Sequence, residues 1–208
     1  MPDFILEDRL LLPVDASIAG VDEVGRGSLA GPVTAVAAVL DRSRCTVDKL
    51  EKIDDSKRVS LKNRQGAMVF ICEIAIIGVG FASRKEIDRL NILWASMLAM
   101  ERAVSDLQKK LTQPLAFALI DGNRLPKLKC PSQAIIKGDS RSFSIAAASI
   151  VAKSIRDALM VKMANRYPEY GWEKNMGYGT RAHLEALKKY GVTDQHRRGF
   201  GPVANALE

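Results

Sequence analysis

Apolar runs along this chain predict strands that alternate with helices. Five runs predict strands, at residues 18–22, 31–40, 73–82, 115–120 and 134–136. Apolar residues are nearly continuous in the first two runs, which is typical of a sheet that is covered on both faces. Four other segments predict helices, at residues 60–72, 83–110, 142–165 and 180–190. This order of elements predicts an α/β fold with helices on both faces of a sheet.

Two local signals concern the predicted helix at residues 83–110. Ser83 and Glu86 have the spacing of a capping box, in which each side chain accepts a hydrogen bond from a backbone N–H at the start of the helix. Trp94, Met97 and Met100 recur at helical spacing further along. We interpret these three side chains as core residues, because apolar positions repeated at this spacing form one face of a helix.

The composition is ordinary for a globular domain. Of 208 residues, 47% are apolar and 26% are charged, which is enough for one domain with a substantial core. Cys45, Cys72 and Cys130 are widely spaced and form no C-x-x-C pair. Their spacing argues against a disulfide framework and a zinc site, and favours a reducing compartment such as the cytoplasm. We expect no signal peptide and no membrane span, because no apolar run approaches ~20 residues.

Charge is distributed unevenly along the chain. Residues 1–121 carry 16 Lys and Arg against 17 Asp and Glu, whereas residues 122–208 carry 15 against 7. The whole excess of +7 therefore comes from the second segment. Such a basic segment favours a polyanion, most commonly nucleic acid, as the partner, although a solvated basic surface has the same composition.

The most informative polar motif follows the first predicted strand. Asp22 and Glu23 end that strand, and Gly25, Arg26 and Gly27 come next. Carboxylates at a strand end can hold a hard divalent cation, and glycines beside an arginine let backbone N–H groups and a guanidinium approach a phosphate. Together they indicate phosphodiester chemistry. Successive strand residues face opposite sides, so we expect the strand to end at Asp22, with the backbone carbonyl of Glu23 as an alternative ligand.

Two more carboxylates lie at the ends of predicted elements. Asp121 follows a predicted strand, and Asp139 precedes a predicted helix. With Asp22 and Glu23 they form an all-oxygen ligand set, which favours Mg²⁺ or Mn²⁺ over Zn²⁺. Two such ions, roughly 3.5–4 Å apart, would activate a water molecule and stabilise the leaving oxygen. Other interpretations remain open, namely a turn at Asp121, a helix cap at Asp139, and an ion pair between the first two carboxylates and the nearby arginine.

A series of short motifs continues along the rest of the chain. They are Asp55-Ser56-Lys57, Ile87-Asp88 with Asn91-Ile92-Leu93, Ile120-Asp121-Gly122-Asn123, Lys137-Gly138-Asp139, the run from Ala147 to Lys153, Gly177-Tyr178-Gly179-Thr180 and His196-Arg197-Arg198. Together with residues 18–33, these motifs cover nearly the whole chain. In their identity and order they make the chain resemble ribonuclease HII, the type 2 ribonucleases H.

This resemblance implies a ribonuclease H-like α/β fold, in which helices flank both faces of a central mixed sheet. A catalytic domain would span residues 1–170, and a small helical C-terminal part would span residues 171–208. The implied activity is that of an endonuclease that cleaves the RNA strand of RNA/DNA hybrids. It would also cut 5′ of ribonucleotides embedded in duplex DNA, as in ribonucleotide excision repair. The implied cofactor is Mg²⁺ or Mn²⁺, and the expected state is a monomer in the cytoplasm.

The resemblance also assigns roles to individual residues. The implied acidic site, which would be catalytic and bind the metal, consists of Asp22, Glu23, Asp121 and Asp139. The residues that would read the 2′-OH, the group that distinguishes RNA from DNA, are Gly25, Arg26 and Gly27. Tyr178 would stack on the next sugar. The residues that would contact phosphates are Lys57, Asn91, Ser149 and Lys153.

Four positions depart from the family pattern. Ser28 stands where a proline is usual, which is expected to loosen the loop. Met176 stands where a lysine is usual, which would remove one backbone contact. Ala146 and Gly199 each stand where a serine is common. None of the four carboxylates is affected.

The remaining polar residues of interest lie in the basic segment. We interpret His183 and His196 as surface or helix residues rather than as metal ligands. Arg197 and Arg198 are adjacent, and we interpret them as a phosphate-binding patch, with a solvated pair as the alternative.

Two alternative functions share part of this sequence pattern. A non-catalytic protein that binds RNA/DNA hybrids would share the basic segment but would not need four carboxylates. A related metal-dependent nuclease of the same fold that acts on DNA would need the carboxylates but not the Gly-Arg-Gly motif beside them.

Overall fold

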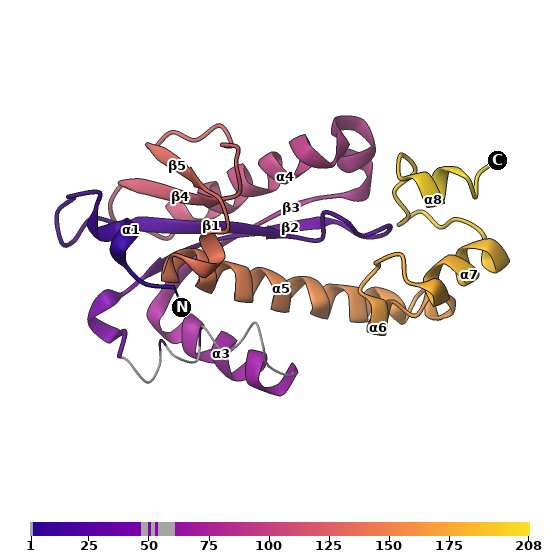
Figure 1. Cartoon of the computed structure of the whole chain (residues 1–208), viewed down its shortest axis with the longest axis horizontal. Coiled ribbons are helices and arrows are strands. Elements are labelled where there is room, and N and C mark those ends of the chain that lie inside the picture. Colours follow the sequence, from indigo (N-terminus) through magenta and orange to yellow (C-terminus); the bar gives the residue numbers. More distant parts are fainter. Residues whose placement is uncertain (1, 47–49, 51–52, 54–60) are drawn as a thin grey trace.

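The computed structural model of the chain describes residues 2–46, Leu50, Ile53 and residues 61–208. At its centre lies one five-stranded sheet (Figure 1). The strands are β1 Ile18–Val24, β2 Val33–Leu40, β3 Ala75–Ala82, β4 Phe117–Asp121 and β5 Ser132–Ile135. In space their order is β3-β2-β1-β4-β5. The pairs β1–β2 and β2–β3 are antiparallel, whereas β1–β4 and β4–β5 are parallel, so the sheet is mixed.

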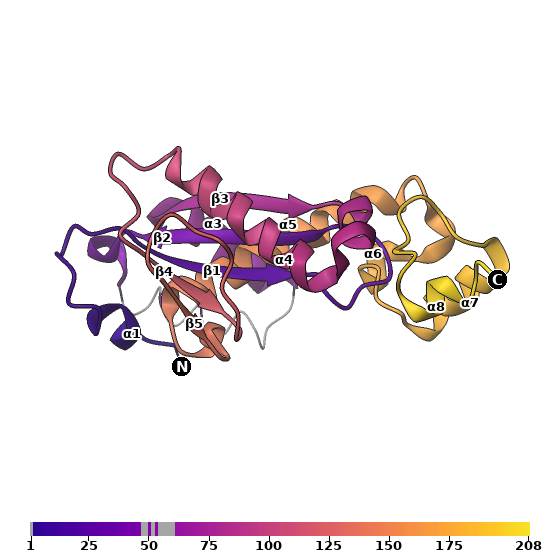
Figure 2. The ribbon, with the colours of Figure 1, turned by 90° about the horizontal axis from the view of Figure 1, so that it is seen from above.

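Helices cover both faces of this sheet (Figures 1 and 2). The long helices are α3 Leu61–Ile74, α4 Arg84–Gln108 and α5 Phe143–Ala164. α4 packs on one face, and α3 and α5 pack on the other. The shorter helical elements are α1 Ile5–Asp8, η1 Arg42–Arg44, η2 Gly138–Ser140, η3 Pro168–Tyr170, α6 Trp172–Asn175, α7 Arg181–Tyr190 and α8 Gly201–Ala204. The predicted α/β fold with a helix-covered mixed sheet is confirmed.

The side chains of β2 alternate between two apolar cores. Val33 and Ala35 belong to the core beneath α4, whereas Val36 and Ala38 belong to the core beneath α3 and α5. Both faces of the strand are therefore buried, because its side chains point alternately to the two sides. This arrangement explains why the sequence of β2 is apolar throughout.

α5 approaches β1 most closely at Gly20. A Cβ atom at this position would lie 2.0 Å from the backbone carbonyl carbon of Ser144, so only glycine allows the approach. α5 begins here because the Ser142 hydroxyl caps it and accepts a hydrogen bond from the Ile145 N–H at 3.1 Å. The first turns of α5 therefore lie directly over β1, two residues before the carboxylate of Asp22.

The C-terminal helices form a third apolar cluster at the far end of α5 (Figure 1). Its fully buried side chains include Trp172, Val203 and Met160, the last of which comes from α5. Leu29, from the loop between β1 and β2, is buried in the same cluster. The C-terminal part is therefore packed onto that loop. The domain boundary after residue 170 stays a prediction.

Each predicted strand differs from the observed strand by one or two residues at one or both ends. β1 does not end at Asp22, because its pairing with β2 continues to Val24, which lies opposite Thr34. The strand predicted at residues 73–82 begins only at Ala75, because α3 extends to Ile74. Apolar runs mark the middle of a strand well, but strand ends depend on partners that are distant in sequence.

The capping box at the start of α4 is confirmed. The Ser83 hydroxyl accepts a hydrogen bond from the Glu86 N–H, and the Glu86 carboxylate accepts one from the Ser83 N–H at 2.8 Å. Met97 and Met100 are buried as predicted, but Trp94 is 53% exposed, so its assignment to the core is wrong. Steps of three residues spread these side chains over about 120° of the helix circumference. Trp94 falls at the solvent edge of that arc.

The remaining expectations concern cysteines and membranes. Cys45, Cys72 and Cys130 form no disulfide, in agreement with their spacing. Within the residues that the structure describes, no helix has both the length and the apolar character needed to cross a bilayer.

Candidate active site

Asp22 and Asp121 lie side by side on neighbouring parallel strands. The last paired residues of β1 and β4 are Val21 and Ile120, and the two aspartates come immediately after them. Equivalent positions on neighbouring parallel strands lie at the same end and on the same face of the sheet. The face is the one covered by α5, because Ser149 of that helix forms a hydrogen bond with the Asp22 carboxylate. The structure thus brings together two carboxylates that are far apart in sequence.

Asp22 is buried in a site that disfavours its charged form. Its pKa is raised well above the ordinary value, first by burial and then by repulsion from Glu23 and Asp121. Two hydrogen bonds act in the opposite direction, one from Ser149 and one from the Glu23 N–H, which lies 2.7 Å from Asp22 Oδ1. A positively charged partner such as a divalent cation would stabilise the carboxylate here.

Glu23 is the next residue of the same regular strand, so its side chain leaves the opposite face of the sheet. Its Oε1 accepts a hydrogen bond from Arg26 Nη1 at 3.1 Å, so the ion-pair interpretation is confirmed for this carboxylate. Its Oε2 is buried and has no hydrogen-bond partner among the described residues. Burial raises the pKa of Glu23, Arg26 lowers it, and Asp121 raises it. Despite its orientation, Glu23 therefore belongs to the same electrostatic cluster.

Asp121 and Asp139 are linked through one glycine. Asp121 Oδ1 accepts a hydrogen bond from the Gly138 N–H at 2.6 Å, and Asp139 is the next residue in the short helix η2. The helix-cap interpretation of Asp139 is wrong, because Ser142 caps α5. The turn at Asp121 is present, since Gly122 follows it with φ of 102°. A turn at a strand end does not prevent the carboxylate from taking part in a site.

A metal cage made of these residues stays a prediction. In the described part of the chain, no three His, Cys, Asp or Glu side chains converge closely enough to form a ready-made metal site. The donor chemistry nevertheless fits a hard cation. All the candidate ligands are oxygens, one of them is the orphaned and buried Glu23 Oε2, and burial and mutual repulsion raise the pKa of Asp22.

The Gly-Arg-Gly motif and Tyr178 lie next to each other beside these carboxylates. Gly25 follows the end of β1 directly and has φ of 93°, a conformation that favours glycine. A Cβ atom on Gly27 would lie 3.7 Å from Cε1 of Tyr178, so the loop and the ring are in contact range. The Arg26 side chain is 48% exposed and Tyr178 is 38% exposed. Both can therefore meet a ligand.

The predicted phosphate contacts are spread over two helices. Ser149 and Lys153 are one turn apart on α5, and Lys153 Nζ lies 2.6 Å from Asp157 Oδ1. Asn91 is exposed and interrupts α4 with φ of 63°, and its side chain accepts hydrogen bonds from the N–H groups of the second half of the helix. Lys57 lies outside the described residues. Ser149 is thus the predicted phosphate contact that the structure joins to the carboxylates.

The family model of Ribonuclease HII matches residues 19–203. The chain belongs to the ribonuclease HII family. The chain is 50% identical over 207 residues to Ribonuclease HII of Paramagnetospirillum magneticum, and the match covers 100% of this chain and 99% of that protein. Membership of this family makes the protein a nuclease, in agreement with the cluster of carboxylates.

Solved structures of a ribonuclease H2 and a ribonuclease HIII have a fold similar to that of this chain. The ribonuclease H2 of Pyrococcus horikoshii OT3 matches with a TM-score of 0.71 at 27% identity, over 91% of this chain and 96% of that one. The Bst ribonuclease HIII in complex with Mn²⁺ matches with a TM-score of 0.73 at 20% identity, over 92% of this chain and 69% of that one. The ribonuclease H-like fold expected from the sequence is therefore confirmed.

Departures of this chain from the ribonuclease HII pattern are accommodated locally. Ser28 is fully buried, and its hydroxyl accepts a hydrogen bond from Arg156 Nη2 at 2.8 Å, which ties the loop. The Met176 carbonyl accepts another from Arg156 Nη1 at 2.9 Å. Ala146 is buried in α5, and Gly199 is exposed.

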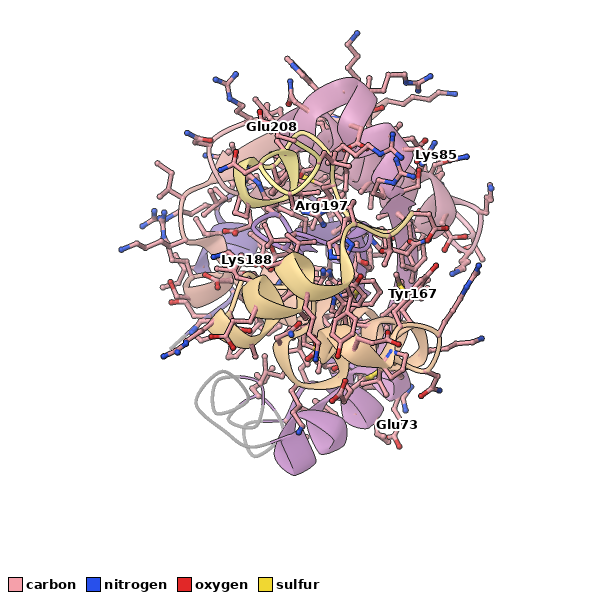
Figure 3. The ribbon with its side chains drawn as sticks, turned by 90° about the vertical axis from the view of Figure 1, so that its right-hand side faces the viewer. Glu73, Lys85, Tyr167, Lys188, Arg197 and Glu208 are labelled. Carbon is pink, nitrogen blue, oxygen red and sulfur yellow. The ribbon has the colours of Figure 1, made fainter. Side chains whose placement is uncertain are left out.

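Two interpretations of the basic segment are wrong. His196 is neither at the surface nor in a helix, and it is fully buried in an aromatic cluster with Trp172. His183 belongs to the same cluster and lies in helix α7, which agrees with its interpretation as a helix residue, although it is also fully buried. Arg197 is also fully buried and donates its hydrogen bonds to backbone carbonyls, so it is not part of a phosphate patch. Figure 3 shows Arg197 near the middle of the C-terminal end of the molecule. Arg198 is exposed.

Sequence reasoning also missed Arg156. This residue is fully buried in α5, although an arginine on a helix is usually exposed. The signal was its position in a helix whose preceding residues are almost all Ala, Ile, Val and Ser. An arginine in such a helix has to find buried acceptors.

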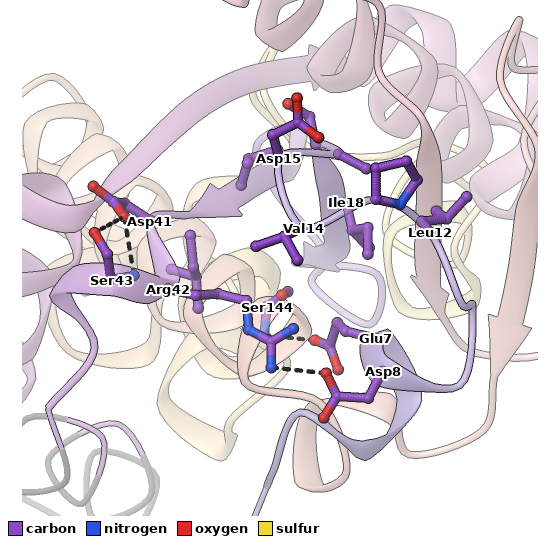
Figure 4. A pocket seen from close by; sticks show the side chains of 15 residues that line it. Glu7, Asp8, Leu12, Val14, Asp15, Ile18, Asp41, Arg42, Ser43 and Ser144 are labelled. Atoms are coloured by element: carbon purple, nitrogen blue, oxygen red, sulfur yellow. Dashed lines mark hydrogen bonds and ion pairs between the residues drawn. The ribbon is translucent and has the colours of Figure 1, made fainter.

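A cavity of about 470 Å³ lies at the opposite end of β1 (Figure 4). Its lining includes Ile18, the first residue of β1, and Leu40, the last residue of β2. Its buried Glu7 accepts hydrogen bonds from the Ser142 hydroxyl at 2.7 Å and the Ser144 N–H at 3.4 Å, and so completes the start of α5. The residues around this cavity therefore support the start of α5, and the cavity lies away from the candidate site.

Proposed function

We propose that this protein is an endonuclease that hydrolyses the RNA strand of RNA/DNA hybrids. It also cuts 5′ of single ribonucleotides embedded in duplex DNA and leaves 3′-OH and 5′-phosphate ends. The observation that carries the proposal is the placement of Gly25, Arg26 and Gly27 directly after the strand that presents Asp22, with Tyr178 against the same loop. Carboxylates for hydrolysis thus lie beside groups that can recognise a sugar.

Mg²⁺ or Mn²⁺ would be held by Asp22, Glu23, Asp121 and Asp139, with the backbone carbonyl of Glu23 as the alternative to its carboxylate. Two such ions would activate the attacking water and stabilise the leaving oxygen in an in-line displacement. The protein's part is to hold these carboxylates in place. β1 and β4 fix Asp22 and Asp121 side by side, and the Gly138 N–H anchors Asp121 to the turn that carries Asp139.

The other residues would select and position the nucleic acid. The backbone N–H groups of the Gly-Arg-Gly motif would bind the 2′-OH, which only a ribonucleotide offers. The ring of Tyr178 would stack on the next sugar. Phosphate contacts would come from Asn91, Ser149 and Lys153, and from Lys57. The basic charge of residues 122–208 would supply the general attraction to the duplex.

Recognition of a single ribonucleotide fits a role at the first step of ribonucleotide excision repair. We expect the protein to act as a monomer, because the proposed groups all come from one chain. The reduced state of its cysteines fits the cytoplasm.

The test uses one DNA duplex with a single ribonucleotide, and a matched duplex with the corresponding deoxyribonucleotide. Each is incubated with Mg²⁺, Mn²⁺ or EDTA, and the cut is mapped to the nucleotide. We expect one cut on the 5′ side of the ribonucleotide with either metal, none in EDTA and none in the all-DNA duplex. Cleavage of both duplexes would instead indicate a DNA nuclease of the same fold, and binding without cleavage would indicate a hybrid-binding protein.

A further inference from the structure

Two fully buried arginines lie beneath the loop that joins β1 to β2, residues 25–32, which we call the β1–β2 loop. Arg156 comes from α5, and Arg197 comes from the segment between α7 and α8. Among the described residues, neither forms an ion pair with a carboxylate. Burial of an unpaired guanidinium is costly unless its N–H groups are all engaged. The hydrogen-bond acceptors around the two guanidinium groups therefore explain how these arginines can be buried.

Arg197 binds both ends of the β1–β2 loop. Its Nη2 donates to the Gly25 carbonyl at 2.6 Å, and its Nη1 donates to the Arg26 carbonyl at 2.8 Å. Its Nε donates to the Gly31 carbonyl at 3.0 Å, and Nη2 also reaches the Pro32 carbonyl at 3.3 Å. The planar fork of a guanidinium can span these carbonyls at once, which an ammonium group cannot do.

Arg156 binds the same loop from Ser28 to its end at Pro32. Its Nη2 donates to the Ser28 hydroxyl at 2.8 Å and to the Ala30 carbonyl at 3.3 Å, and its Nε donates to the Pro32 carbonyl at 3.2 Å. A Cβ atom on Gly25 would lie 2.0 Å from Arg156 Nε, so the first glycine of the motif is needed for this packing. Of the eight hydrogen bonds that the two arginines donate, all but the one to the Met176 carbonyl go to the β1–β2 loop.

These contacts determine which way the N–H groups of the motif point. In a trans peptide the C=O and the following N–H point in opposite directions. Because the carbonyls of Gly25 and Arg26 point inward to Arg197, the N–H groups of Arg26 and Gly27 point outward. Neither N–H has a hydrogen-bond partner among the described residues. Two adjacent outward donors beside Asp22 can bind one oxygen or phosphate of a ligand.

We propose that Arg197 and Arg156 are positioning residues for recognition of the 2′-OH. By holding the carbonyls of the β1–β2 loop inward, they keep the N–H groups of Arg26 and Gly27 directed at the substrate. The inference rests on the proposed function, because it assigns those N–H groups to the ribonucleotide. Neither arginine touches the substrate, and their effect passes through the loop backbone.

The experiment compares the wild-type protein with Arg197→Lys, which keeps the charge and removes the fork. Binding is measured in EDTA for a duplex with one ribonucleotide and for the matched all-DNA duplex. We expect the preference for the ribonucleotide to fall roughly tenfold in Arg197→Lys, as when a buried hydrogen-bonded network loses its partners. Binding to the all-DNA duplex should stay within about twofold, because its phosphate contacts are unaffected.

The control is Val203→Ala, which trims a fully buried side chain of the same C-terminal cluster but removes none of the hydrogen bonds between the two arginines and the β1–β2 loop. It should lower the melting temperature and keep the preference. An equal loss of preference in Val203→Ala would show that general loosening is enough, and would overturn the proposal. If Arg197→Lys does not fold, Ser28→Ala decides the matter, because it removes one acceptor of Arg156 and should reduce the preference about threefold. An unchanged preference in Ser28→Ala would then overturn the proposal.

Backbone amide signals of Arg26 and Gly27 in a ¹⁵N NMR spectrum report the loop without any substrate. We expect both to shift in folded Arg197→Lys and to stay in place in Val203→Ala. Unchanged signals in folded Arg197→Lys would contradict the positioning role of Arg197 but not the proposed function. A wild-type protein that shows no preference for the ribonucleotide would contradict the proposed function instead, and the amide signals would still show whether Arg197 sets the loop.

Discussion

The imidazole of His183 holds the backbone of Tyr178. Its Nδ1 lies 2.9 Å from the Tyr178 carbonyl oxygen, which can only accept, so Nδ1 donates. Its Nε2 therefore accepts from Trp172 Nε1 at 3.1 Å and from His196 Nε2, also at 3.1 Å. His196 Nδ1 in turn accepts from the Thr193 N–H at 3.0 Å. In this network both imidazoles are neutral, and the tautomer of each follows from its partners.

The first prediction is that this histidine pair makes the protein less stable in mild acid. Burial, and then the neighbouring His183, lower the pKa of His196 to about 4, and burial lowers the pKa of His183. The unfolded chain binds a proton near pH 6.5, which folded His196 binds only near pH 4. The free energy of unfolding should therefore fall as the pH falls from 6.5 to 4, by on the order of 3 kcal/mol for His196.

Urea unfolding of the wild type and of His196→Gln, measured from pH 8 to pH 4, checks this prediction. The variant lacks the titrating group, so the difference in stability between the two proteins should be constant above pH 6.5. Below pH 6.5 the difference should change in favour of the variant, because only the wild type loses stability through His196. Parallel curves over the whole range would mean that His196 is not held neutral by the fold.

The second prediction is that Asp121→Asn lowers the cleavage rate by about 10² or more. The amide oxygen can still accept the hydrogen bond from the Gly138 N–H, so the shape of the site is kept while a charge is lost. Binding of the duplex should stay the same or tighten, because repulsion of the phosphates is reduced. Single-turnover cleavage in Mg²⁺ and anisotropy in EDTA measure the two effects.

A matched control for that variant is Asp106→Asn. This carboxylate lies on α4 and pairs with Lys110, away from the candidate site. Its removal should leave cleavage unchanged. Near-normal cleavage by Asp121→Asn would remove that residue from the site.

The third prediction concerns the ring of Tyr178. The Arg156 guanidinium lies over the ring, 5.8 Å from its centre, and 38% of the residue is exposed. If the ring stacks on a sugar, Tyr178→Phe should retain most activity. Tyr178→Ala should lose about 1–3 kcal/mol, by analogy with stacked bases on single strands. The loss should be larger for a single ribonucleotide than for a long hybrid, which offers many alternative registers.

Cleavage of both substrates and the melting temperature of both Tyr178 variants separate stacking from a structural role. His183 bonds only the backbone carbonyl of Tyr178, so its contact survives the substitutions. An equal loss on both substrates together with a lowered melting temperature would rule out stacking.

The fourth prediction is that Lys153→Gln reduces the salt dependence of binding by about one phosphate contact. The slope of log affinity against log salt should change by about 0.9, with no change in the position of the cut. The matched control is Lys110→Gln, because both lysines form an ion pair with an aspartate one helical turn away. Equal slopes for wild type and Lys153→Gln would place this lysine away from the phosphates.

The sequence alone was sufficient to predict the five strands and to place Asp121 at the end of one of them. Asp121 could be predicted because an apolar run ends at it, and β4 ends there. The end of β1 could not be predicted, because only the pairing with Thr34 of β2 extends the strand to Val24. The side chains of Asp22 and Glu23 consequently leave opposite faces, a geometry that depends on the partner strand.

The sequence pattern could not predict which charged residues are buried. Local reasoning treats adjacent arginines as solvated or phosphate-binding, and Arg198 is indeed exposed. Arg197 is buried because four carbonyls of the β1–β2 loop meet its side chain. No local propensity encodes such acceptors, since they come from another part of the chain.

The bond between Arg197 and the Gly25 carbonyl joins residues 172 positions apart. During synthesis on the ribosome the β1–β2 loop therefore emerges long before Arg197. A nascent chain that stops short of Arg197 already carries Asp22 and Asp121, but of the two arginines only Arg156 can hold the loop. If Arg197 positions the loop as proposed, selectivity for ribonucleotides would be acquired later in synthesis than the carboxylates of the candidate site. A fragment that ends before Arg197 would then distinguish RNA from DNA less well than the whole chain.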